Sequence, residues 1–82
     1  MVHHLEIDKA DLFHQIKHGQ IKWGGNKKLK IYGTLHCKSG KRMKRENRVF
    51  FASEQEAMNH GYRPCGHCTR SKYRIWMNKH IN

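Results

Sequence analysis

The sequence contains few cysteines, few acidic residues and no long apolar run, and each shortage excludes a class of protein. Three cysteines in 82 residues cannot all pair as disulfides within one chain. No apolar stretch approaches the roughly 20 residues of a membrane-spanning helix, and residues 1–6 lack the apolar segment of a signal peptide. We therefore expect a cytoplasmic protein with free thiols, because disulfides are rare in that compartment.

The shortage of acidic residues leaves a strong positive charge. Lys and Arg number 17 against 6 Asp and Glu, a formal net charge of +11. From Lys22 to Arg48 the single acid is Glu46, so this segment is predicted to bind phosphates. The same charge also fits an ordinary solvated face. A membrane surface fits less well, because the segment has no sustained helical apolar stripe.

The most specific pattern is a Cys-x-x-Cys pair, Cys65 and Cys68, with the remaining cysteine, Cys37, upstream. Such a turn offers two thiolates to one tetrahedral metal, and zinc is its natural occupant. Redox use is the competing interpretation, but a redox motif normally lies in a βαβ context, which does not precede it here. We therefore expect Zn²⁺ as the cofactor, which would also help so short a chain to fold.

Local signals predict one α+β domain over residues 1–82, zinc-stabilised, with a short antiparallel sheet flanked by helices. Asp8 is a suitable N-cap for a helix over residues 9–18. We expect the apolar stripe of this helix to be core. The zinc-binding region is predicted to cover about residues 29–80.

Short apolar runs at 21–23 and 29–32 predict a β-hairpin with its turn at residues 24–26. Gly33 is expected to end the second strand, and a further strand is expected at 48–52. Ser53 with Glu56 three residues later is a capping box for a short helix that ends at Gly61. A last helical stretch follows Cys68.

The run from Gly33 to Cys68 resembles the metal-binding domain of the Ada family. An Arg-Glu-Asn strand at 45–47, an acid-capped helix and a Gly-aromatic-Arg-Pro-Cys-x-x-Cys segment at 61–68 occur in that order. The resemblance implies a small fold around one zinc held by four cysteines. It also implies that one of these thiolates removes a methyl group from a methylphosphotriester in DNA and is consumed.

The chain departs from this family pattern at the methyl acceptor. The family has two cysteines four positions apart before the Arg-Glu-Asn segment, and the first is the acceptor. Here Cys37 matches the second, and Gly33 stands at the first. Either Cys37 is both ligand and acceptor in a suicide methyltransferase, or the domain binds zinc and DNA without repair. A third hypothesis is a structural zinc module whose basic face binds RNA or an acidic protein.

The loss of one cysteine leaves the fourth metal ligand open. His36 is next to Cys37, but neighbouring side chains on an extended strand point apart. His67 lies inside the Cys-x-x-Cys turn, where ligation by three residues of the turn would be strained. A water molecule, as in catalytic zinc sites, and His60 are two further candidates for the fourth position.

The resemblance gives Arg63, the residue before Pro-Cys, the role of contacting phosphate. Further predicted contacts to DNA are Lys41, Arg42, Arg45 and Arg48. Arg45 and Arg63 could instead pair with Glu46 or Glu56 as structural ions. Trp23 and Tyr32 fit base stacking, but core or hairpin positions fit them better. We expect a monomer that binds the phosphate backbone of DNA and has no small-molecule substrate.

Overall fold

The computed structural model describes residues 1–37 and 43–80, so Lys41 and Arg42 lie outside the described residues. Its strands are β1 (Val2–His3), β2 (Trp23–Asn26), β3 (Ile31–Thr34), β4 (Arg48–Phe51) and β5 (Arg63–Pro64). Its α-helices are α1 (Lys9–Lys17), α2 (Glu54–Asn59) and α3 (Arg70–His80). Two 3₁₀ turns, η1 (His4–Glu6) and η3 (Arg45–Asn47), precede α1 and β4.

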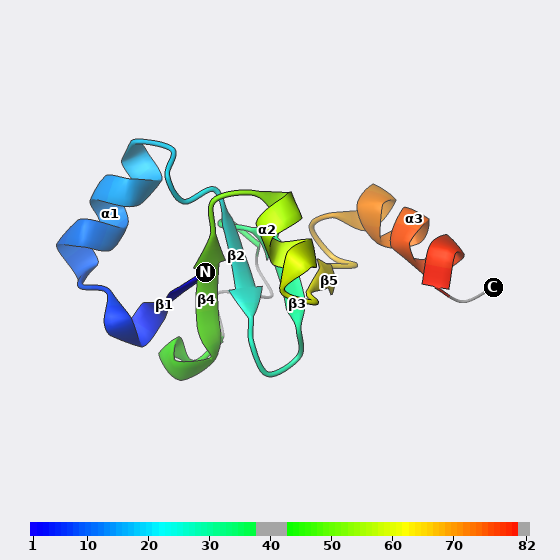
Figure 1. The fold of residues 1–82 in the computed structure, drawn as a ribbon, viewed down its shortest axis with the longest axis horizontal. Coiled ribbons are helices and arrows are strands. Elements are labelled where there is room, and N and C mark those ends of the chain that lie inside the picture. Colours follow the sequence, from blue (N-terminus) through cyan, green and yellow to red (C-terminus); the bar gives the residue numbers. More distant parts are fainter. Residues whose placement is uncertain (38–42, 81–82) are drawn as a thin grey trace.

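The strands form one sheet in the order β1-β4-β2-β3-β5 (Figure 1). All neighbouring strands are antiparallel except β3 and β5, which are parallel. The predicted α+β class, a small domain with a sheet and flanking helices, is therefore confirmed. The parallel pair matters for function, because it places the Cys-x-x-Cys segment that follows β5 beside the end of β3.

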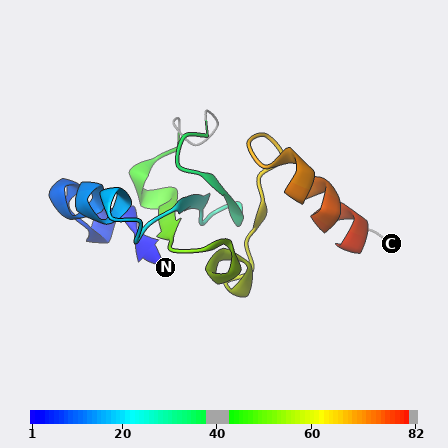
Figure 2. The same ribbon diagram turned by 90° about the horizontal axis from the view of Figure 1, so that it is seen from above.

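The two faces of the sheet are built differently. One face packs against α2 and forms the hydrophobic core, which consists of Tyr32, Val49, Phe51, Ala57 and Tyr62, with Trp23 packed against it. Figure 2 shows α2 on one side of the sheet only. On the opposite face, the strand register places Gly24 next to both Gly33 and Phe50. Two glycines side by side leave this second face with little side-chain cover.

The predicted hairpin is correct, but its turn is misplaced. Gly24 and Gly25 lie inside β2, and residues 27–30 make the turn. Asn26 stabilises that turn, because its side-chain oxygen accepts hydrogen bonds from two backbone amides at 3.0 and 3.1 Å. Position 25 of this strand requires glycine, because a Cβ there would lie 2.9 Å from the Phe51 ring. Gly33 does not end β3 but is paired within it.

The helix α1 begins and ends as predicted, yet its apolar stripe is not core. Asp8 caps it by accepting a hydrogen bond from the Asp11 amide at 2.8 Å. None of its residues is buried, and Phe13 is 69% exposed. The reason is its position, because α1 lies beyond the β1 edge of the sheet and not over a face (Figure 1).

The second capping signal is confirmed, whereas the expected Arg-Glu-Asn strand is wrong. The Ser53 hydroxyl accepts a hydrogen bond from the Glu56 amide at 3.1 Å, and the Glu56 carboxylate accepts one from the Ala52 amide at 2.8 Å. Gly61, at φ +83°, follows the helix. The Arg-Glu-Asn segment is the turn η3, and the strand begins only at Arg48.

The molecule measures 43 × 23 × 20 Å. It is elongated because α1 and α3 lie at opposite ends of the sheet (Figures 1 and 2). Within residues 1–37 and 43–80, no helix has the length and apolar character needed to cross a membrane.

Candidate metal centre

The fold brings the three cysteines together. The Sγ atoms of Cys37, Cys65 and Cys68 all lie within 4.8 Å of one another, although the first is 28 residues from the second. The Sγ atoms of Cys37 and Cys65 are 3.9 Å apart. Ligands about 2.3 Å from a tetrahedral zinc are about 3.8 Å from each other, so this spacing suits a common metal ion.

Backbone hydrogen bonds fix the positions of Cys65 and Cys37 relative to β3. The Cys65 amide donates to the Tyr32 carbonyl of β3 at 2.8 Å, which fixes the turn after β5 against β3. The Cys65 carbonyl accepts from both the amide and the hydroxyl of Thr69, the residue just before α3. The Cys37 amide donates to the Thr34 carbonyl at 3.3 Å in a turn just after β3. The metal centre therefore lies where β3, β5 and α3 meet.

Two backbone amides point at the sulfur atoms. The Thr34 amide donates to Cys68 Sγ at 3.3 Å, and the His67 amide donates to Cys65 Sγ at 3.4 Å. Such bonds favour the thiolate over the thiol. Burial acts in the opposite direction and raises the pKa of the Cys68 thiol to about 11. A bound cation would reverse that balance, because metal ligation requires the deprotonated thiol.

Gly33 lies at the centre of this group. A Cβ at Gly33 would be 2.6 Å from Cys68 Sγ, 3.2 Å from Cys65 Cβ and 4.0 Å from Cys65 Sγ. A side chain at this position would therefore project among the sulfur atoms. This agrees with the resemblance described above, which implies a fourth cysteine at the position of Gly33.

The histidines considered as fourth ligands lie outside the cluster. In the described part of the chain, the group of donor atoms within 4.8 Å contains the three cysteines and no histidine. His36 and His67 are both exposed, as is His60. Residues 38–42 contain no histidine, cysteine or acid. The identity of the fourth ligand stays a prediction.

A family model described as the metal binding domain of Ada matches residues 17–70, more than half of the chain. The chain belongs to this family. No curated protein and no solved structure gives a match to it. Soft thiolate donors suit Zn²⁺ and not a hard cation such as Mg²⁺, so the donor set fits the metal of the family. The cofactor of this Ada-type domain is Zn²⁺, which Cys37, Cys65 and Cys68 would hold.

Arg63 lies on β5, two residues before the first cysteine of the Cys-x-x-Cys turn. Its guanidinium carbon is 5.1 Å from the centre of the Tyr73 ring and 5.7 Å from that of Trp76, and Nη1 donates to the Pro64 carbonyl at 3.3 Å. Among residues 1–37 and 43–80, no carboxylate lies within 4.0 Å of Arg63 or Arg45. The alternative, in which these two arginines form structural ion pairs with Glu46 or Glu56, is not seen within that part of the chain.

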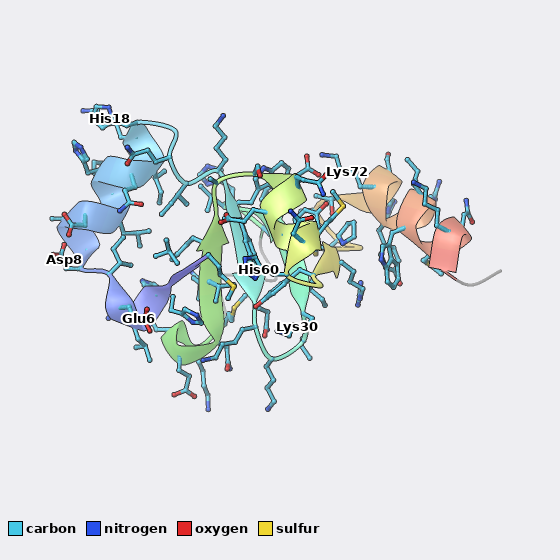
Figure 3. The ribbon with its side chains drawn as sticks, in the orientation of Figure 1. Glu6, Asp8, His18, Lys30, His60 and Lys72 are labelled. Carbon is cyan, nitrogen blue, oxygen red and sulfur yellow. The ribbon has the colours of Figure 1, made fainter. Side chains whose placement is uncertain are left out.

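The sequence interpretation missed the contribution of α3. Tyr73 and Trp76 stack with ring centres 6.1 Å apart and hold the Arg63 guanidinium. Their i, i+3 spacing in a basic helix is a signal that could have found them. Lys72 of α3 pairs with Glu54 of α2 and lies 4.8 Å from the centre of the Trp23 ring (Figure 3). Tyr32 and Trp23 are core residues, as expected.

Proposed function

We propose that this zinc domain binds the phosphate backbone of DNA through the cationic residues beside the metal centre, without transferring a methyl group. The observation that carries the proposal is the environment of Arg63. Its guanidinium is held over two aromatic rings, and no carboxylate of the described residues neutralises it. An arginine fixed in this way offers its remaining donors to a phosphate at little cost in side-chain entropy.

Several lysines and a second arginine extend the same basic surface. The Arg63 amide donates to the carbonyl of Lys30 at 2.9 Å, so the two residues are neighbours on β5 and the β2–β3 turn. That turn also carries Lys27 and Lys28, all three lysines being exposed. Arg48 begins β4 and is paired with Asn26, the last residue of β2 before that turn. Membership in the Ada family adds an association with DNA alkylation repair, which we extend to this chain as part of the proposal.

Two observations support binding without methyl transfer. Gly33 replaces the acceptor cysteine of the family pattern and has no nucleophile. Cys37, the second candidate acceptor, is only 9% exposed, whereas a reacting methyl group must approach the sulfur to about 3–3.5 Å. A domain that binds near methylphosphotriesters and leaves them intact fits both observations.

The test is binding of the zinc-loaded chain to duplex DNA at several salt concentrations. We expect affinity to fall with salt, with a slope of about 0.9 for each phosphate contacted. Arg63→Ala should weaken binding and lower that slope by about one. Lys17→Ala, which removes one charge from α1 at the far end of the molecule, is the control and should change neither. Circular dichroism should show that both variants fold.

Two results would contradict the proposal. Equal affinity of Arg63→Ala and the parent chain would remove Arg63 from the contact surface. Tighter binding to RNA or to an acidic peptide than to duplex DNA, at matched charge, would favour the structural zinc module instead.

The variant Arg63→Lys separates the contribution of charge to DNA affinity from that of side-chain shape, because lysine keeps the charge but lacks the planar fork of donors.

A further inference from the structure

A cavity of about 160 Å³ opens beside the metal centre, on the sheet face opposite α2. Gly33, Cys37 and Cys65 belong to both the cavity wall and the cysteine group. The rest of the wall is mainly apolar and includes Leu29, Ile31, Leu35, Met43 and Phe50, with Arg48 as a cationic member.

The cavity exists because two glycines face each other across neighbouring strands. Gly24 of β2 is paired with Gly33 of β3, so neither strand contributes a side chain to this part of the face. A Cβ at Gly24 would meet its nearest atoms, in Leu35 and Val49, at 3.8 and 3.9 Å, which are ordinary contact distances, so there is room for a methyl group there. Glycine within a strand often marks a place where another group approaches the backbone closely.

The same glycine leaves the ligand set incomplete. Zinc in proteins is four-coordinate in nearly all structural sites, and the described cluster supplies three sulfur atoms. A side chain at Gly33 would project toward Cys68 and Cys65, as the distances above show. Position 33 supplies no donor because Gly33 has no side chain, and the Cys68 and Cys65 side chains lie directly against it. The open space next to the cysteines is the cavity, whose wall includes Cys37 and Cys65, and a fourth ligand would reach them from there.

We propose that a small thiol with an apolar body binds in this cavity and supplies the fourth ligand. The size fits, because a cavity of about 150 Å³ lined by apolar side chains is known to hold benzene. The apolar wall favours a hydrocarbon body, and a soft sulfur donor matches the three cysteines. On binding, the thiol S–H bond breaks, the proton passes to solvent and the thiolate sulfur takes the fourth position. No group is oxidised or reduced.

This inference concerns a ligand that the sequence did not lead us to expect. It rests on zinc binding and on the cavity, and not on the proposed contact with DNA. The two proposals can therefore fail separately, since one is read from salt-dependent DNA binding and the other from the spectrum of the metal centre.

The experiment uses the full chain loaded with Co²⁺, whose visible absorption reports the number and type of its ligands. Thiophenol is the probe, phenol is the same ring without sulfur, and 2-sulfanylethanol is a thiol without an apolar ring. We expect thiophenol to change the spectrum with saturation at one equivalent and phenol to leave it unchanged. With affinities compared at equal thiolate concentration, because the aromatic thiol is the stronger acid, thiophenol should bind at least about tenfold more tightly than 2-sulfanylethanol, since its ring buries more apolar surface.

Two variants locate the site. Gly33→Cys should give a four-thiolate spectrum without added thiol and no response to thiophenol. Gly24→Ala leaves the cysteines alone and places one methyl group in the cavity at ordinary contact distances. It should weaken the binding of thiophenol by about fourfold, the equivalent of ~0.8 kcal/mol for one buried methylene. The binding of 2-sulfanylethanol should not change. Because Gly24→Ala introduces no close contact, it tests the cavity even if Gly33→Cys fails to fold.

Three results would overturn the inference. A parent spectrum that already reports four protein ligands and ignores thiophenol would mean that the chain completes its own site. Equal affinity for the two thiols would mean that the apolar cavity takes no part in binding. An undiminished response in a folded Gly33→Cys variant would place the thiol elsewhere.

Discussion

The two faces of the central sheet differ in the interactions that stabilise them. The α2 face is closed by aromatic packing, with Phe51 and Tyr62 meeting edge to face at 4.9 Å between ring centres. The opposite face carries paired glycines, a cavity and three sulfur atoms. Aromatic burial stabilises the first face, whereas on the second face a bound metal would hold the cysteines together. Stability and chemistry are thus separated between the two sides of one small sheet.

Metal removal should have the largest effect on stability, because the whole cysteine side of the sheet is expected to depend on the bound ion. We expect chelation of zinc to unfold much of the region after Gly33, since the turn after β5 ties β3 to α3 and metal binding in small domains is coupled to folding. Hydrogen exchange with and without a chelator measures this. Native protection of the Cys65–Thr69 amides in the metal-free chain would show that the aromatic face alone maintains the fold.

Two adjacent glycines allow the faces to be compared by the same substitution. Gly25→Ala places a Cβ on the α2 face, 2.9 Å from the Phe51 ring and 3.1 Å from the Ile31 carbonyl. We expect it to reduce the free energy of unfolding by about 1–3 kcal/mol. Gly24→Ala points into the cavity and should change it by less than about 0.5 kcal/mol. Urea unfolding of the zinc-loaded variants measures both, and equal losses would mean that the faces are packed alike.

A smaller effect than those of metal removal and Gly25→Ala is expected for the hydrogen bond that joins β3 to α2. Tyr32 Oη donates a hydrogen bond to Glu54 Oε2 at 3.0 Å. Burial, together with this bond and the nearby carboxylate, raises the pKa of Tyr32 to about 12 from 10.0. Because the folded state holds this proton more tightly, its contribution is complete below pH 10 and is lost as pH rises toward 12.

Tyr32→Phe tests that link. We expect a loss of about 1 kcal/mol in the free energy of unfolding near neutral pH and a weaker decline of stability above pH 10. Titration by ultraviolet absorbance in the parent should show one tyrosine ionising near pH 12. The half-buried Tyr73, whose Tyr73→Phe variant leaves the Glu54 bond in place, is the matched control.

Local sequence signals were sufficient to predict features in which the interacting groups are only a few residues apart. Asp8 and Ser53 cap their helices because the side-chain oxygen and the amide it accepts from are three residues apart. The spacing of Cys65 and Cys68 likewise indicated a shared metal site. These features depend on a few consecutive residues, so the sequence contains the information needed to predict them.

Features that depend on distant partners could not be predicted in the same way. Gly24 and Gly25 are typical turn residues, but contacts with β3 and β4 hold them in a strand. The parallel pairing of β3 with β5 joins segments far apart in the sequence and has no local signal. The stripe of α1 has helical spacing, yet spacing cannot tell whether any surface lies against it. The cavity could not be predicted from the sequence, because it depends on the strand register that pairs Gly24 with Gly33.

The most direct test is native mass spectrometry of the zinc-loaded chain before and after incubation with DNA that carries methylphosphotriesters. We expect one zinc ion per chain and no added methyl group, because Gly33 stands where the proposed family pattern has its acceptor cysteine and because Cys37 is buried. Loss of that zinc when any one of the three cysteines is changed to serine would support the ligand set. A methyl group added at Cys37 would contradict our interpretation and establish a repair protein with a relocated acceptor.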